Sequence, residues 1–232
     1  MDFGAYGFNN SPTLQKHVIT RPDITTSMAS FFKNLASSVT SSFLEMPEYE
    51  VLETSEEYEV RRYPESKWVT TKTESISRDK SSSELFWRLF NYIAGKNENK
   101  QKIEMTAPVA MRIIPGAGPN CESQFFMSFY LGKEHWEKPP KPESDQVYHE
   151  TYPPMEVYVR KFGGFAKDDK WIEEASKLAE VLPKDAQYNK DFYFTSGYDA
   201  PFKLFNRRNE VWFVKESESD KKPAPSENGT DS

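Results

Sequence analysis

The sequence predicts an α+β fold, a pseudo-twofold sheet or barrel of two β–α–β–β halves with two main helices packed outside it. Three observations predict this fold. Strand and helix patterns alternate through residues 47–215, two segments have the 3.6-residue apolar period of helices, and short motifs occur in both halves. The halves are expected at about 47–132 and 146–215, each with one helix beside its strands.

The first half is predicted to place several strands around one helix. The helix covers residues 81–96, is N-capped by one of the serines at 81–83, and stops at Gly95. In the last strand of this half, Phe125, Met127, Phe129 and Leu131 fall on one face. The strands are indicated by alternating polar and apolar residues at 49–63 (two short runs), 67–73, 102–114 and 124–132.

The second half follows a Pro-rich loop at 138–145. Its helix covers residues 168–183 and has one apolar stripe, with acids and lysines on the outside. The stripe consists of Trp171, Ile172, Ala175, Leu178, Ala179 and Leu182. Packing against a core explains this stripe fully. The strands of this half are expected at 155–165, 191–198 and 209–214.

Two pairs of motifs suggest that the halves are related. V-R-R-Y at 60–63 matches V-R-K-F at 159–162, and T-A-P at 106–108 matches D-A-P at 199–201. Proline has no amide hydrogen, so it cannot donate to a strand ladder. We therefore expect a bulge or sharp bend at Pro108 and Pro201 that ends regular pairing there.

The first helix is more apolar than packing on one surface requires. At ~100° per residue, its apolar residues cover an arc of about 160°, and Trp87 extends the arc to roughly 220°. The other members are Leu85, Phe86, Leu89, Phe90, Tyr92 and Ile93. The excess could be covered by the 138–145 loop or the N-terminal arm, could line an apolar ligand groove, or could bind a protein partner.

The composition excludes several classes of protein. The 232-residue chain has a formal net charge of −6, which does not favour nucleic-acid binding, and no apolar run is long enough to span a membrane. A single cysteine, Cys121, favours a reducing compartment such as the cytoplasm. Residues 1–46 are expected to be a disordered or partly helical arm, with mitochondrial import as an alternative, and 216–232 a disordered tail.

No catalytic constellation is present in the sequence. The three histidines, His17, His135 and His149, do not share metal-ligand spacing, so no metal site is predicted. No nucleophile occurs with a base, and there is no phosphate loop. The sequence therefore predicts a protein that is not an enzyme.

Five motifs together resemble the SOUL/haem-binding protein family, in its SOUL-type branch. They occur in one order over about 48–215: Y-E-V-R-R-Y-x-x-x-K-W-V (58–69), N-Y-I-x-G-K-N (91–97), K-I-E-M-T-A-P-V (102–109), F-G-G-F (162–165) and G-Y-D-A-P-F-K-L-F-N-R-R-N-E-V-W (197–212). The resemblance implies a distorted β-barrel and a cytosolic, non-enzymatic binder of haem or other tetrapyrroles.

The resemblance also implies a shallow apolar groove for the ligand. One wall is the first helix, with Phe86, Leu89 and Phe90. The other wall is the loop between the last two strands, with Tyr198, Pro201, Phe202, Leu204 and Phe205. The helix with the wide apolar arc is thus the one that the family would use.

The sequence departs from the family at charged positions. Some members have a histidine, proposed as an iron ligand, where this chain has Arg62, and a guanidinium offers iron no lone pair. Basic residues at the ends of the first helix in other members are replaced by Ser83 and Asn91. The haem propionates could instead pair with Arg88, Lys203, Arg207 or Arg208. Haem binding is therefore expected to lack a protein ligand to iron.

Two other classes of function are kept as alternatives. Relatives of this type are said to carry a BH3-like helix, which would map to 165–182 and bind Bcl-2-type proteins through Ile172, Ala175, Ala179 and Leu182. The core already requires that stripe, so exposing it would require unfolding. By fold analogy alone, the chain could also be a small-molecule sensor or carrier.

Overall fold

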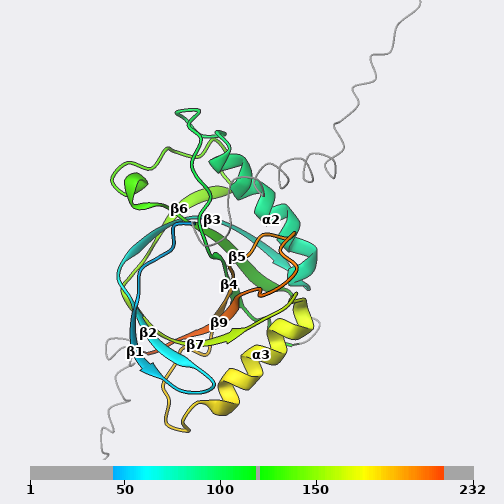
Figure 1. Cartoon of the computed structure of the whole chain (residues 1–232). Coiled ribbons are helices and arrows are strands. Elements are labelled where there is room, and N and C mark those ends of the chain that lie inside the picture. The colour runs from blue at the N-terminus through cyan, green and yellow to red at the C-terminus, as the bar shows by residue number, and fades with distance from the viewer. Residues whose placement is uncertain (1–43, 119–120, 217–232) are drawn as a thin grey trace, which may run out of the picture. The chain divides into compact units, whose positions relative to one another are not determined.

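The structure, a computed structural model, describes residues 44–118 and 121–216 (Figure 1). Most of the predicted N-terminal arm and nearly all of the predicted tail lie outside these residues. The elements follow in the order β1 (Glu50–Thr54), β2 (Glu59–Tyr63), β3 (Ser66–Ser75), α2 (Arg78–Ile93), β4 (Val109–Ile114), β5 (Ser123–Tyr130), the 3₁₀ turn η2 (Lys133–His135), β6 (Val147–Tyr152), β7 (Met155–Phe162), α3 (Asp168–Val181), β8 (Tyr193–Gly197) and β9 (Asn209–Val214).

All the strands belong to one nine-stranded antiparallel sheet. Its order is β1-β2-β7-β9-β8-β4-β5-β3-β6, so β1 and β6 are its edges. Within residues 44–118 and 121–216, no backbone pairing joins β1 to β6, and the sheet is open. The predicted α+β class and the two helices are confirmed, whereas the distorted barrel stays a prediction.

The strand order reads alike from both ends once β1 is set aside. From one end it is β2-β7-β9-β8, and from the other β6-β3-β5-β4. Strand β7 therefore corresponds to β3, not to β2, so V-R-R-Y in β2 and V-R-K-F in β7 are not in equivalent strands. The proposed motif match was wrong in this respect. Pro108 likewise precedes β4, whereas Pro201 follows β8.

A mainly aromatic cluster packs on one face of the sheet. Its members are Tyr63, Trp68, Ala110, Tyr130, Tyr152, Val157, Val159, Phe194 and Trp212. The ring centroids of Tyr152 on β6 and Phe194 on β8 are 5.6 Å apart. Four strand spacings would separate β6 from β8 by about 19 Å in a flat sheet. The sheet must therefore curl strongly around this cluster.

The opposite face carries both helices. Helix α2 buries Leu85 and Leu89 in a cluster with residues of β3, β4, β5 and β6, and α3 buries Trp171 and Leu178 against β2, β7 and β9. Figure 1 shows both helices outside the curled sheet. Because both faces of the sheet are covered, a strand such as β5 is apolar on both sides along much of its length.

Several predicted boundaries differ from the structure. Helix α2 begins at Arg78, and its N-cap is Ser77, whose hydroxyl accepts a hydrogen bond from the Lys80 amide, so serines 81–83 are not the cap. The predicted strand 102–114 is reduced to 109–114, and the Ala107–Pro108 peptide bond is cis. Neither Pro108 nor Pro201 lies in a strand, so the expected end of regular pairing at both is confirmed. Strand β6, which contains His149, was missed.

The predicted stripe of α3 is only partly buried. Trp171, Leu178 and Leu182 are buried, but Ile172 is 57% exposed. Ala179 is exposed as well. The charged residue Glu174 is buried instead, because its carboxylate accepts a 2.7 Å hydrogen bond from Nε of Arg160 on β7. An ion pair replaces part of the apolar contact that the helical period predicted.

Candidate functional site

The aromatic residues of α2 that exceed its core stripe form a small stacked group. The rings of Phe86 and Phe90 are nearly parallel, with an interplanar angle of 9° and centroids 5.9 Å apart. Trp87 meets both rings edge-on. All three side chains are half-buried, and Phe86 also packs against Phe129 of β5. These contacts fix a partly exposed aromatic surface, which we call the α2 aromatic surface.

Leu89 does not belong to this surface. Its side chain is fully buried in the core beneath α2, together with Leu85. The helical period placed Leu89 on the apolar arc correctly, but its position at the centre of that arc directs it into the sheet. The predicted first wall thus divides into an accessible pair, Phe86 and Phe90, and a core leucine.

The predicted second wall is the β8–β9 loop, residues 198–208. Pro201, Phe202, Leu204 and Phe205 are exposed, whereas Tyr198 is buried and donates a 2.7 Å hydrogen bond from its hydroxyl to Glu210 Oε2. Figure 1 draws this loop in orange. The loop therefore presents apolar side chains to solvent, while Tyr198 anchors its first end.

An arginine organises the interior of this loop. The guanidinium of Arg207 donates to the backbone carbonyl oxygens of Asp199, Ala200 and Lys203. Asp199 accepts from Nζ of Lys203 and from the amide of Arg208. These bonds satisfy the polar backbone of the turn internally and leave its apolar side chains outside.

A buried ionic network lies at the base of the loop and was missed by sequence reasoning. Arg61 of β2 and Glu210 of β9 form a bidentate pair with N–O distances of 3.0 and 3.1 Å. Trp212 Nε1 and Arg208 Nε also donate to the Glu210 carboxylate. The sequence pattern could have indicated this pair. Strand alternation places Arg61 on the same face of β2 as Tyr63, and Glu210 on the same face of β9 as Trp212.

The protonation states of the network follow from these contacts. Burial alone would raise the pKa of the Glu210 carboxyl, but the charge and hydrogen bonds of Arg61 and Arg208 hold that pKa below its usual value. Burial and the neighbouring Glu210 carboxylate raise the pKa of Tyr198 well above that of a free phenol. Glu210 is therefore an anion and Tyr198 a neutral donor at the base of the loop.

Comparison with known proteins places these features in a family. The family profile described as SOUL heme-binding protein matches residues 44–214. The human protein named heme-binding protein 2 is 41% identical over 165 residues, covering 71% of this chain and 80% of its own length. Heme-binding protein 1 of Xenopus tropicalis is 32% identical over 158 residues, covering 68% and 83%. This chain belongs to the SOUL family.

The fold also occurs in a solved structure with low sequence identity. A structure titled as an EcmrR–DNA complex has a TM-score of 0.52 and 9% identity to this chain, of which it covers 84%, with 65% of its own chain aligned. At this identity the likeness concerns the fold alone.

The position of Arg62 is an exposed site on β2. Its guanidinium pairs with Glu50 and Glu156. Hydrogen bonding to Glu156 raises the pKa of Arg62. Ser83 is exposed and Asn91 half-buried on α2. Ser83 and Asn91 carry no positive charge, and the guanidinium of Arg62 is already paired with carboxylates.

The four predicted propionate contacts are engaged within the chain. Arg88 bonds Glu84 and the carbonyl oxygen of Lys72. Arg207 holds the loop carbonyls, Lys203 pairs with Asp199, and Arg208 pairs with Glu210. Lys203 and Arg208 each keep about a third of their side chain exposed, at 34% and 33%.

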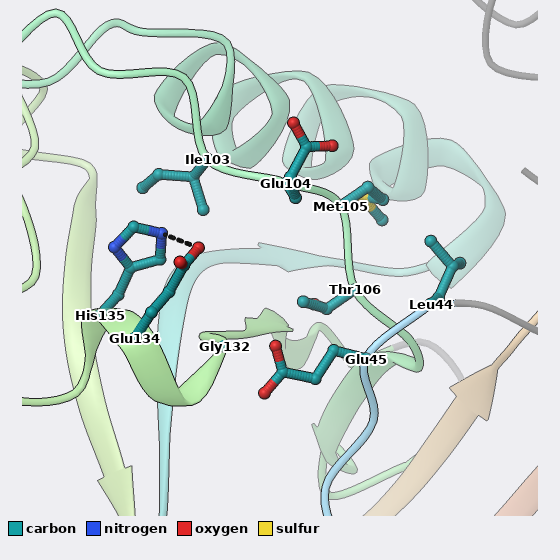
Figure 2. A pocket seen from close by; sticks show the side chains of 9 residues that line it. All are labelled: Leu44, Glu45, Ile103, Glu104, Met105, Thr106, Gly132, Glu134 and His135. Atoms are coloured by element: carbon teal, nitrogen blue, oxygen red, sulfur yellow. Dashed lines mark ion pairs between the residues drawn. The ribbon is translucent and has the colours of Figure 1, made fainter. Parts of the chain in front are cut away.

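Hollows occur elsewhere on the described surface. One of about 220 Å³ is lined by residues 44–45, 103–106, 132, 134 and 135 (Figure 2). Buried His135 lies there with Nε2 3.1 Å from Glu134 Oε1. Another of about 340 Å³ lies between α2 and residues 142–147, a region that includes part of the Pro-rich loop. That loop also accepts a hydrogen bond from the Tyr92 hydroxyl at Pro140 O.

Three further predictions concern a metal site, a membrane-spanning helix and the BH3-like helix. Within this part of the chain, no group of three or more His, Cys, Asp or Glu side chains could hold a metal, and no helix is long and apolar enough to cross a membrane. The anchors of the BH3-like hypothesis do not share one environment, because Leu182 is buried whereas Ile172 and Ala179 are exposed.

Proposed function

We propose that this SOUL protein binds haem or another tetrapyrrole reversibly, against the α2 aromatic surface and the β8–β9 loop, and catalyses no reaction. The observation that carries the proposal is the stacked Phe86–Trp87–Phe90 group, which is ordered by its own contacts but only half-buried. A flat apolar macrocycle can pack on such rings at little conformational cost to the protein. The names of the SOUL relatives support haem as the ligand.

The binding mode that we propose has no protein ligand to iron. Of the described histidines, His149 lies with Nε2 3.0 Å from the Tyr92 hydroxyl, and His135 pairs with Glu134. Burial is the main cause of a lowered pKa at His149. Pro201, Phe202, Leu204 and Phe205 would contact the macrocycle from the loop. Lys203 and Arg208 would lie nearest the propionates, because Arg88 and Arg207 hold backbone carbonyl oxygens and the Arg88 side chain is only 18% exposed.

The experiment is a hemin titration followed by the Soret band, with wild type and the double variant Phe86→Ala/Phe90→Ala. We expect a saturable shift in the wild type and at least a tenfold weaker affinity in the variant, since each lost ring removes on the order of 1 kcal/mol or more of contact. Phe126→Ala is the matched control, because Phe126 is a half-buried phenylalanine on the other face of the sheet, under Arg112.

Two results would contradict the proposal. A wild type without a saturable Soret shift would remove haem as a ligand. Equal weakening by Phe126→Ala and by the double variant would show that the loss reflects general destabilisation and not the α2 aromatic surface.

We further propose that the curled sheet derives from two related halves, as the family resemblance implies, and that the protein works in the cytoplasm. The symmetric strand order supports the first proposal. The exposed free thiol of Cys121 supports the second, because such thiols persist in reducing compartments.

A further inference from the structure

Two segments place large apolar side chains in solvent at one end of the sheet. Phe165 follows β7 and is 59% exposed, and Leu204 and Phe205 of the β8–β9 loop are 65% and 80% exposed. We call Phe165, Leu204 and Phe205 the apolar tip. Side chains of this size are seldom exposed so fully in a small neighbourhood unless they serve binding.

One hydrogen bond and one cation–π contact join the two segments that carry the apolar tip. The guanidinium of Arg207 lies over the Phe165 ring, with its central carbon 4.5 Å from the ring centroid. Asn209 Nδ2 donates to the carbonyl oxygen of Gly164, so the foot of the β8–β9 loop is fixed to the segment after β7. The segment after β7 and the β8–β9 loop are therefore in contact with each other.

The surroundings of the apolar tip are basic in an acidic protein. Residues 161–167 and 198–208 contain five cations, Lys161, Lys167, Lys203, Arg207 and Arg208, and one acid, Asp199, for a local net charge of +4. The whole chain has a net charge of −6. Lys161, Lys203 and Arg208 pair with Glu59, Asp199 and Glu210. The two segments therefore carry a net positive charge of their own, part of which neighbouring carboxylates offset.

We propose that the apolar tip is a membrane-docking site that inserts into the surface of an anionic lipid bilayer. Aromatic and aliphatic side chains gain free energy on entering the boundary between headgroups and acyl chains, and cations around them are attracted to anionic headgroups. The side chains of the apolar tip project into solvent, so they are available to insert into the surface of a fluid bilayer. Binding through so few apolar side chains is weak, reversible and sensitive to salt.

The first test measures cosedimentation of the full chain, without haem, with two kinds of vesicle. We expect binding to phosphatidylcholine vesicles containing about 30% phosphatidylserine, little binding to pure phosphatidylcholine, and loss of binding at about 0.5 M salt. Leu204→Ser/Phe205→Ser should lower the partition coefficient at least tenfold. The matched control is Val51→Ser/Leu52→Ser, two adjacent exposed apolar residues on β1, which lies well away from the loop in Figure 1.

The second test reports insertion at the apolar tip directly. Because Cys121 is the chain's single cysteine, Cys121→Ser allows one environment-sensitive fluorophore to be attached through Phe205→Cys or, as a control, through Val51→Cys. We expect a blue shift at position 205, and none at position 51, when anionic vesicles are added.

The outcomes separate this proposal from haem binding. Phe86→Ala/Phe90→Ala should bind vesicles as the wild type does, even though its affinity for haem is lowered. Failure of the wild type to bind anionic vesicles, or equal binding to neutral ones, would overturn the membrane proposal. So would a probe at 205 that is shielded before vesicles are added, since another part of the chain would then occupy the tip.

Discussion

Arg61 and Arg62 are neighbours on β2, but they lie on opposite faces of the sheet. The Arg61 side chain is fully buried and pairs with the equally buried Glu210, whereas the Arg62 side chain is 54% exposed and pairs with surface carboxylates. A buried ion pair is compensated only while both partners remain, because an unpaired charge cannot be solvated in the core. The same residue type should thus contribute very differently at these two positions.

We expect Arg61→Ala to lower the free energy of unfolding by about 3–5 kcal/mol, since it leaves the Glu210 carboxylate buried without its bidentate partner. Arg62→Ala should lower it far less, because exposed ion pairs contribute little to stability. Urea denaturation followed by tryptophan fluorescence measures both values. Similar losses for the two variants would show that the Glu210 network does not depend on Arg61.

At the scale of elements, the two helices cap each other. The Ser77 hydroxyl at the start of α2 donates to Asp168 Oδ2, and the Asp79 amide donates to Asp168 Oδ1. In return, the Asp168 amide at the start of α3 donates to Asp79 Oδ2. Each helix thus supplies an acceptor for free amide hydrogens at the N-terminus of the other, which couples their positions on the sheet.

Helix α3 is also fixed to β7 by the buried carboxylate of Glu174. Burial alone would raise its pKa, but hydrogen bonds from Lys170, Arg160 and Lys177 lower the pKa to about 2. Its usual value is 4.5. Because the folded state lowers this pKa, the stabilisation is complete above about pH 4.5 and is lost as the pH falls towards 2.

Glu174→Gln should therefore flatten the dependence of stability on pH in this acidic window. We expect the wild type to lose up to about 3 kcal/mol more than the variant between about pH 5 and pH 2. Urea unfolding at several pH values tests this. Glu180→Gln, at an exposed position of the same helix, is the control and should leave the slope unchanged. Parallel curves for the wild type and Glu174→Gln would contradict the assignment.

Some elements could be predicted from the sequence and others could not. Both helices and most strands could be predicted, because their apolar periods reflect burial on one or both faces. Strand β6 could not, because its buried residues Val147 and Tyr152 are five positions apart and give no alternating pattern. Of the predicted site, the α2 aromatic residues followed from an arc too wide for one face. The Arg61–Glu210 pair and the bonding of Arg207 required the three-dimensional structure.

At the scale of the whole molecule, strands from the N-terminal and C-terminal parts of the chain pair with each other. Strand β2 pairs with β7, and β6 pairs with β3. The aromatic cluster inside the curl takes residues from both parts, including Trp68 and Trp212. Neither part alone can therefore form the whole sheet or the whole aromatic cluster.

Unfolding is thus expected to be a single cooperative transition. Circular dichroism and tryptophan fluorescence should give the same urea midpoint, and fragments 44–137 and 138–216 should each be unfolded alone, because each lacks a partner strand and half of the aromatic cluster. Mixing the fragments should restore strand signal in proportion to the complex formed. Two separate transitions, or a fragment that folds independently, would show that the pairing between the two parts is dispensable and that each part has a sufficient core.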